Sequence, residues 1–257
     1  STDYLYRLRF KARSASSGWP EKIRVAMGKD RTVEALDREV LPVTLVNTVD
    51  SREYEQLFSL DEAGVWYLGF QSCSDAQMFK LYLDEINLEV AAPMNAPTPV
   101  SDLQLTPGSQ GERSVHVTFT APSATMGGAP LQTIDKMTLR RGAVFLETFK
   151  TVAAGTVLTS DDATCDLGNN TYTVFSTNEA GNSIETSATV FVGKDSPGLP
   201  QHIVLHETAD GREHLTWDAP EKGQNGGYVD ADELKYHIVY GNDEQTVIAM
   251  NLTDREY

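Results

Sequence analysis

Apolar and polar residues alternate along most of the chain with a period of two. In the run YLYRLRF at residues 4–10, one face carries Tyr4, Tyr6, Leu8 and Phe10, and the two arginines fall on the other. The runs IRVAM (23–27), VHVTF (115–119) and LTW (215–217) repeat the alternation. This pattern predicts half-buried antiparallel strands. The one candidate helix, residues 33–40, is short and has no apolar stripe, so a turn of helix or a loop fits it equally.

Two proline-rich stretches, residues 92–99 and 193–200, divide the chain. Proline lacks the amide hydrogen that a strand ladder needs and fixes φ, so such stretches end strands and form short, semi-rigid linkers. The predicted domains are residues 1–93, 94–195 and 196–257, termed below the first, second and third segments.

The second and third segments repeat one another at an offset of about 100 residues, the size of one immunoglobulin-like sandwich. An alternating strand follows each pair of glycines. The matched stretches are residues 103–105 with 203–205, 119–122 with 217–220, and 127–128 with 226–227.

The composition excludes several classes of function. The chain has 21 Lys and Arg against 37 Asp and Glu, a net charge of −16. Nucleic-acid binding needs basic patches, so no nucleic-acid partner is expected. No apolar run approaches the ~20 residues that cross a bilayer, so no membrane-spanning segment is expected. Residues 196–257 carry four Lys and Arg against twelve Asp and Glu, which concentrates the acidity in the third segment.

The stretch DLGNNTYTVFSTNEAGNS at residues 166–183 resembles a late strand of fibronectin type III domains. The resemblance places Tyr172 at the tyrosine corner, where the phenol bonds to upstream backbone. It places Trp217 at the buried core tryptophan of the third segment, with Phe119 at that position in the second. The third segment is expected to lack its last two strands.

Residues 6–13, 22–28, 64–70 and 81–86 form the strand-like stretches of the first segment. Together they resemble the C-terminal part of choice-of-anchor J (cleaved-adhesin, MAM-like) jelly-roll domains of secreted Bacteroidetes proteins. The fold expected from pattern and resemblance is all-β: a partial jelly-roll β-sandwich followed by two immunoglobulin-like (fibronectin type III) sandwiches, the last incomplete. With a domain cut at each end, the chain is expected to be a fragment of a larger exported protein.

No motif of a known catalytic class is present, so no catalytic residue is predicted and the chain is not expected to be an enzyme. His202 and His206 share one face of a predicted strand and are interpreted as surface histidines, with a metal site as the alternative. Cys73 and Cys165 lie in different segments and are expected to be free, largely buried thiols.

Calcium is the one cofactor for which the sequence offers ligands. The resemblance implies a structural Ca²⁺ beside Asp84 and Glu85, placed at the close of the last strand of the first segment. Carboxylates are the hard oxygen ligands that Ca²⁺ prefers; the alternative is an exposed acidic pair at a strand edge. The acidic residues Asp161 and Asp162, and those at 230–233, are expected to be solvated turns.

Aromatic residues are the candidates for binding a sugar, because sugar C–H faces pack on rings. Trp19, beside Pro20 in a polar loop, is the best candidate. Trp66 and Tyr67 are adjacent in a predicted strand, so one of them should face outward. The alternative is that these rings pack in the core or anchor loops.

These observations lead to a functional hypothesis. The chain is expected to be a non-catalytic, extracellular or cell-surface bacterial protein for adhesion or glycan recognition. The jelly roll would bind a glycan or a host or extracellular-matrix protein, and the fibronectin-type repeats would act as spacers. The alternative is an accessory region of an exported protease or glycoside hydrolase whose catalytic domain lies outside this chain.

Overall fold

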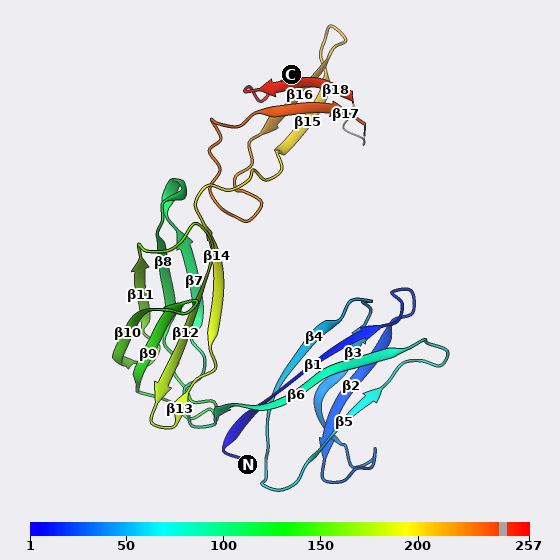
Figure 1. The fold of residues 1–257 in the computed structure, drawn as a ribbon, viewed down its shortest axis with the longest axis vertical. Helices are drawn as coiled ribbons and strands as arrows, with labels where there is room; N and C mark the ends of the chain where they lie inside the picture. Colours follow the sequence, from blue (N-terminus) through cyan, green and yellow to red (C-terminus); the bar gives the residue numbers. More distant parts are fainter. Residues whose placement is uncertain (242–245) are drawn as a thin grey trace.

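The regular secondary structure of the described residues is almost entirely β-strand, as the alternation predicts (Figure 1). The structure, a computed structural model, describes residues 1–241 and 246–257. Within those ranges the only helical element is a short 3₁₀ turn, Ser109–Gly111. Residues 33–37, where a turn of helix or a loop was expected, form a loop, and β3 begins at Arg38. None of the described residues form a helix of the length and apolarity that a membrane span requires.

The first segment contains two three-stranded antiparallel sheets, in the orders β4-β1-β6 and β3-β2-β5. They enclose one core around Leu8, Phe10, Ile23 and Val25, each at most 1% exposed. Alternation produces this core because every second residue of β1 and β2 points inward. The strands are β1 (Tyr4–Ser14), β2 (Glu21–Gly28), β3 (Arg38–Val46), β4 (Arg52–Ser59), β5 (Tyr67–Ser72) and β6 (Leu81–Pro93).

The second segment is also a two-sheet sandwich. One sheet runs β10-β9-β12, with β13 and β14 paired to β12, and the other runs β11-β8-β7. Phe119, Met137, Tyr172 and Val174 fill the core between them. The strands are β7 (Ser101–Pro107), β8 (Val115–Thr120), β9 (Thr133–Arg141), β10 (Val144–Ala153), β11 (Val157–Asp162), β12 (Gly168–Asn178), β13 (Gly181–Asn182) and β14 (Thr186–Val192).

The third segment repeats the first four strands of the second in the same order. β15 pairs with β16 as β7 pairs with β8, and β17 pairs with β18 as β9 pairs with β10. Glu256 then bridges to Thr216 on β16, where β11 pairs with β8 in the second segment. The strands are β15 (Gln201–Glu207), β16 (Glu213–Asp218), β17 (Tyr236–Tyr240) and β18 (Thr246–Leu252).

Each of the two repeats has a glycine turn at the same place. The glycines that correspond, however, differ by one residue from the predicted alignment. Gly128 has φ +85° and donates to the carbonyl of Thr125 at 2.9 Å. Gly226 has the same φ and donates to the carbonyl of Gly223 at 3.0 Å. Gly226 is therefore the counterpart of Gly128, and the pairing of Gly127 with Gly226 was wrong by one residue, because both positions need a left-handed backbone.

Backbone hydrogen bonds join the first segment to the second. The N–H of Met94 donates to the carbonyl of Asp3 at 2.7 Å, and the carbonyl of Met94 accepts from Gly127 at 2.7 Å. Asn178 donates its side-chain amide to the carbonyl of Asn95 at 2.9 Å. Hydrogen bonds thus attach the first proline-rich stretch to both the first and the second segment.

The Asp195 carboxylate organises the junction between the second and third segments. Its Oδ1 accepts from the N–H of Ser196 at 2.7 Å and from the side-chain amide of Asn225 at 2.9 Å. Its Oδ2 accepts from the N–H of Asn225 at 2.7 Å and of Gly227 at 3.1 Å. A Cβ at Gly227 would lie 2.3 Å from the Phe191 ring, so this glycine permits the close approach.

Candidate functional site

Three loops meet at one end of the first sandwich, and backbone hydrogen bonds fix their positions. The N–H of Ser14 at the end of β1 donates to the carbonyl of Thr48 at 2.9 Å. The N–H of Ala15 donates to the carbonyl of Lys80, just before β6, at 3.0 Å. This end of the sandwich, termed the loop end, comprises residues 14–21, 46–52 and 73–80.

Trp19 projects from the first of these loops, with 55% of its surface exposed. A tight turn holds its backbone: the N–H of Trp19 donates to the carbonyl of Ser16, and the N–H of Gly18 to the Ser16 hydroxyl, both at 3.3 Å. Within the described ranges, no aromatic ring or cation packs on the indole. About half of the Trp19 surface is therefore open to solvent and can contact a ligand.

A buried carboxylate lies two residues beyond Trp19. Glu21 begins β2, is 4% exposed, and its Oε2 accepts a short hydrogen bond from the Ser74 hydroxyl. That hydroxyl accepts from the N–H of Lys22 at 2.8 Å, and the Lys22 ammonium lies 3.1 Å from Asp75. The Oε1 of Glu21 has no hydrogen-bond partner in the described part of the chain. Polar and charged groups therefore gather in the same loops as the exposed indole.

Trp66 and Tyr67 lie where β2 ends and β5 begins. Trp66 directly precedes β5 and packs against the core of the first segment, and its Nε1 donates to the carbonyl of Glu62 at 3.2 Å. The ammonium of Lys29 covers its ring at 3.9 Å from the centroid. The Tyr67 ring has the guanidinium of Arg31 at 5.1 Å. Cations therefore lie over the rings of Trp66 and Tyr67. Among the described residues, none lies over the indole of Trp19.

The structure does not bring the three candidate aromatic residues together. Trp19 precedes the first residue of β2, whereas Tyr67 pairs with its last residue, Gly28. An eight-residue strand spans about 25 Å at roughly 3.3 Å per residue. A single sugar ring cannot contact Trp19 and Tyr67 at once, so the loop end stands as a separate candidate site.

Asp84 and Glu85 lie within β6, not at the close of the last strand as the sequence suggested. β6 continues to Pro93 because a bulge opposite β1, with Glu85 at φ +49°, lets the ladder run on. The carboxylate of Glu85 pairs with the ammonium of Lys11 at 2.7 Å. The described residues contain no group of three His, Cys, Asp or Glu side chains placed to hold a metal. A calcium ion at Asp84 stays a prediction.

The two cysteines are free thiols in the structure. Cys73 is partly exposed in the first segment, and Cys165 is buried in the second. Burial raises the pKa of the Cys165 thiol, which disfavours the reactive thiolate. The environment of Cys165 therefore does not favour a reactive site.

Tyr172 forms a corner as expected, but its hydroxyl bonds to a side chain and not to backbone. It donates to the carboxylate of Asp162 at 2.9 Å. Asp162 also pairs with Arg141 and accepts from the N–H and hydroxyl of Thr164 at 2.8 and 2.7 Å. Asp162 is 5% exposed, so the expectation of a solvated turn was wrong: four donor groups, from Tyr172, Arg141 and Thr164, compensate for its burial.

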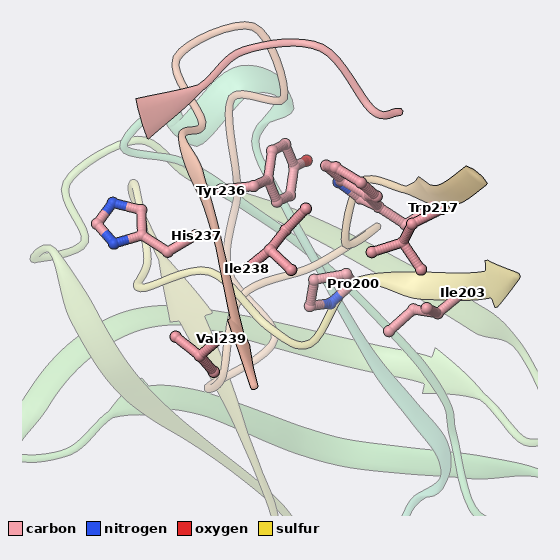
Figure 2. A pocket seen from close by; sticks show the side chains of 8 residues that line it. Pro200, Ile203, Trp217, Tyr236, His237, Ile238 and Val239 are labelled. Carbon is pink, nitrogen blue, oxygen red and sulfur yellow. The ribbon is translucent and has the colours of Figure 1, made fainter. Parts of the chain in front are cut away.

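An apolar depression of about 240 Å³ opens on the third segment (Figure 2). Trp217 and Tyr236 pack edge to face at its side, 5.2 Å between centroids. In the second segment, β12 pairs with β9 and adds Tyr172 and Val174 to the core; the described residues of the third segment include no strand paired with β17 in that position. The lining residues are Pro200, Ile203, Leu215, Trp217, Tyr236, His237, Ile238 and Val239.

The sequence reasoning missed two residues of the loop end. Glu21 begins an alternating strand and reads as a solvated charge, although it is buried against Ser74. Phe79, 67% exposed, lies in the loop before β6; an aromatic residue in a polar loop was the signal that could have found it.

No protein-family model and no curated protein matches the sequence. Among solved structures, the FN1–FN3 domains of chicken CNTN1 align with 92% of this chain and 78% of that chain, at 10% identity and a TM-score of 0.31. The GH2 beta-galacturonidase from Eisenbergiella tayi bound to galacturonate aligns with 85% of this chain and 36% of that chain, at 10% identity and a TM-score of 0.36.

The glycoside hydrolase domain Spr0440 (Endo-D) from Streptococcus pneumoniae R6 aligns with 72% of this chain and 29% of that chain, at 10% identity and a TM-score of 0.25. The chain thus spans much less than two thirds of the two hydrolase chains. Alignments with TM-scores below 0.5 assign no family. What can be argued about function rests on the geometry of the loop end.

Proposed function

We propose that this chain is a non-catalytic extracellular recognition protein that binds a glycan at the loop end of the first sandwich. The observation that carries the proposal is the exposed Trp19 side chain in a loop whose backbone is held by hydrogen bonds. Apolar C–H faces of a sugar pack on such a ring, and the ring needs no rearrangement before it binds.

The polar groups at the same end of the sandwich as Trp19 suit the rest of a sugar. The Lys22 ammonium and the Asp75 carboxylate form an exposed pair at 3.1 Å, and both can exchange this contact for sugar hydroxyls. Ser74 is fixed by Glu21 and by the N–H of Lys22. A few polar groups beside one aromatic platform are the usual composition of a small-ligand site.

The second and third segments serve as spacers in this proposal. Hydrogen bonds at Met94 and at Asp195 fix the two junctions. Sandwiches joined by short, anchored linkers hold a binding end at a set distance from any surface to which the protein is attached.

A glycan array and a panel of extracellular-matrix proteins, probed with the 257-residue chain, test the proposal. We expect at least one glycan to bind and Trp19→Ala to remove that binding. Tyr67→Ala is the matched control, because it removes an aromatic ring of β5 that lies next to the opposite end of β2. Binding to a matrix protein but to no glycan, or equal losses for both variants, contradicts glycan recognition at the loop end.

A further inference from the structure

Two histidines face one another across the outer surface of the third segment. His206 on β15 lies directly opposite His214 on β16 in the antiparallel register. Their rings are nearly perpendicular, at 86°, with centroids 4.9 Å apart. The Nδ1 of His214 and the Nε2 of His206 are 3.3 Å apart. Both rings reach solvent, since His206 is exposed and His214 partly so.

The spacing of these two nitrogens matches that of two ligands on one metal ion. Zinc binds histidine nitrogen at about 2.0–2.1 Å in a tetrahedral geometry, which places two ligand nitrogens about 3.3–3.4 Å apart. His206 and His214 already have this separation. A metal ion could therefore replace the contact between the two rings with little movement of either strand.

Glu256 supplies the group that would orient one of the ligands. Its carboxylate lies 3.5 Å from the Nε2 of His214, and the backbone around it is tied to β16 by hydrogen bonds between Tyr257 and Leu215 at 2.8 and 2.9 Å. A proton on Nε2 directed at this carboxylate leaves Nδ1 free as a ligand. Carboxylates behind metal-bound histidines commonly fix the ring and raise its basicity in this way.

The second segment shows that this arrangement is not a general property of the repeat. His116 on β8 lies opposite Thr106 on β7, and its Nδ1 contacts the carboxylate of Asp161 at 2.6 Å. The second segment therefore has a histidine backed by a carboxylate but no second imidazole across from it. Only the third segment pairs two imidazoles in this position among the described residues.

The charge of the third segment favours a cation. Residues 196–257 contain four Lys and Arg against twelve Asp and Glu. A surface with this excess of negative charge raises the local concentration of divalent cations. Imidazole nitrogen, in turn, selects zinc and related transition metals over magnesium, which prefers oxygen ligands.

We propose that His206 and His214 bind a Zn²⁺ ion, with Glu256 as a positioning residue and water in the remaining coordination positions. The ion would link β15 to β16 next to their connecting turn. Because only two protein side chains ligate it, the site is an exchangeable surface site and not a buried structural one.

Calorimetric titration of the 257-residue chain with zinc chloride tests the proposal. We expect one Zn²⁺ per chain, at least tenfold weaker binding in His206→Gln and in His214→Gln, and roughly tenfold weaker binding in Glu256→Gln. Magnesium chloride should give no binding heat at this site. Circular dichroism without metal checks that each variant is folded.

His116→Gln and His202→Gln are the matched controls. His116→Gln removes a histidine that has a carboxylate beside it but no facing imidazole. His202→Gln removes an exposed histidine of β15, the strand of His206, whose Nδ1 lies 2.8 Å from the Asp218 carboxylate. Both should bind zinc as the parent chain does. Unchanged affinity in His206→Gln or His214→Gln, or an equal loss in either control, overturns the proposal.

Discussion

The Tyr172 hydroxyl donates a hydrogen bond of 2.9 Å to the Asp162 carboxylate inside the second segment. The bond links β12 to the end of β11, ten residues earlier in the chain. Arg141 of β9 pairs with the same carboxylate, so one buried acid connects strands of both sheets. The corner therefore depends on two side chains and not on the tyrosine alone.

Removing the Tyr172 hydroxyl and removing the Asp162 carboxylate should both destabilise the second segment, but by different amounts. Tyr172→Phe loses one hydrogen bond to a charged acceptor, and we expect a cost of about 1–2 kcal/mol. Asp162→Ala leaves the mostly buried guanidinium of Arg141 without a counter-charge, and we expect a cost of about 3–5 kcal/mol. Hydrogen exchange of β12 amides measures the free energy of opening for this segment by itself. Tyr240→Phe, at a largely exposed tyrosine, should change it by less than about 0.5 kcal/mol; equal effects of Tyr172→Phe and Tyr240→Phe would show that the corner adds nothing.

The same carboxylate should make the stability of the second segment depend on pH. Burial raises the pKa of Asp162, but hydrogen bonds from Thr164, Tyr172 and Arg141 outweigh it and hold the pKa below its usual value. A lowered folded pKa contributes stability that is complete above the unfolded pKa, about 3.9, and is lost as the pH falls through the folded value. The advantage of the parent chain over Asp162→Asn, measured by denaturant unfolding, should thus be constant near neutral pH and shrink below about pH 4. An advantage that grows on acidification contradicts this assignment.

The first segment offers a comparison between two tryptophans. Trp66 packs on the core and donates to the carbonyl of Glu62, whereas Trp19 is exposed. We expect Trp66→Ala to lower the free energy of unfolding of the first segment by about 2–3 kcal/mol, somewhat less than a fully buried aromatic residue. Trp19→Ala should change it by less than about 0.5 kcal/mol. Thermal unfolding followed by circular dichroism makes the comparison, and a larger loss for Trp19→Ala would place that indole in a structural role.

The second junction should loosen when Asp195 is removed. Asp195→Ala deletes the acceptor of four hydrogen bonds that hold Ser196, Asn225 and Gly227 in place. We expect trypsin to cleave after Lys194 several-fold faster, because proteolysis follows local opening. Asp166→Ala, at an exposed carboxylate, is the control. Equal cleavage rates in both variants would show that the junction does not depend on Asp195.

Much of the fold follows from the sequence because burial on one face imposes alternation. Residues 4–10 show this directly: Leu8 and Phe10 are buried while Arg9 between them is only partly so. The correspondence between the two repeats could also be predicted, since Phe119 and Trp217 occupy equivalent, buried core positions. Local irregularities of the strands could not be predicted in this way. The bulge at Glu85 lengthens β6 beyond the predicted position of its end, and nothing in the residue types marks it.

The candidate site was predictable only where a single residue carries the signal. Trp19 stands out as an aromatic residue in a polar loop. Glu21 does not, because its burial depends on Ser74, 53 residues later in the chain. Asp162 was misjudged for the same reason: its partners Arg141 and Tyr172 come from other strands, and the paired acids alone resemble an exposed turn. Long-range contacts decide the environment of such groups.

Titration of a glycan identified on the array, comparing the parent chain with Trp19→Ala, tests the central claim most directly. Stacking of a sugar on the indole predicts at least a tenfold loss of affinity in Trp19→Ala, an unchanged affinity in Tyr67→Ala, and an unchanged melting temperature in Trp19→Ala. Full affinity in Trp19→Ala would contradict recognition at the loop end.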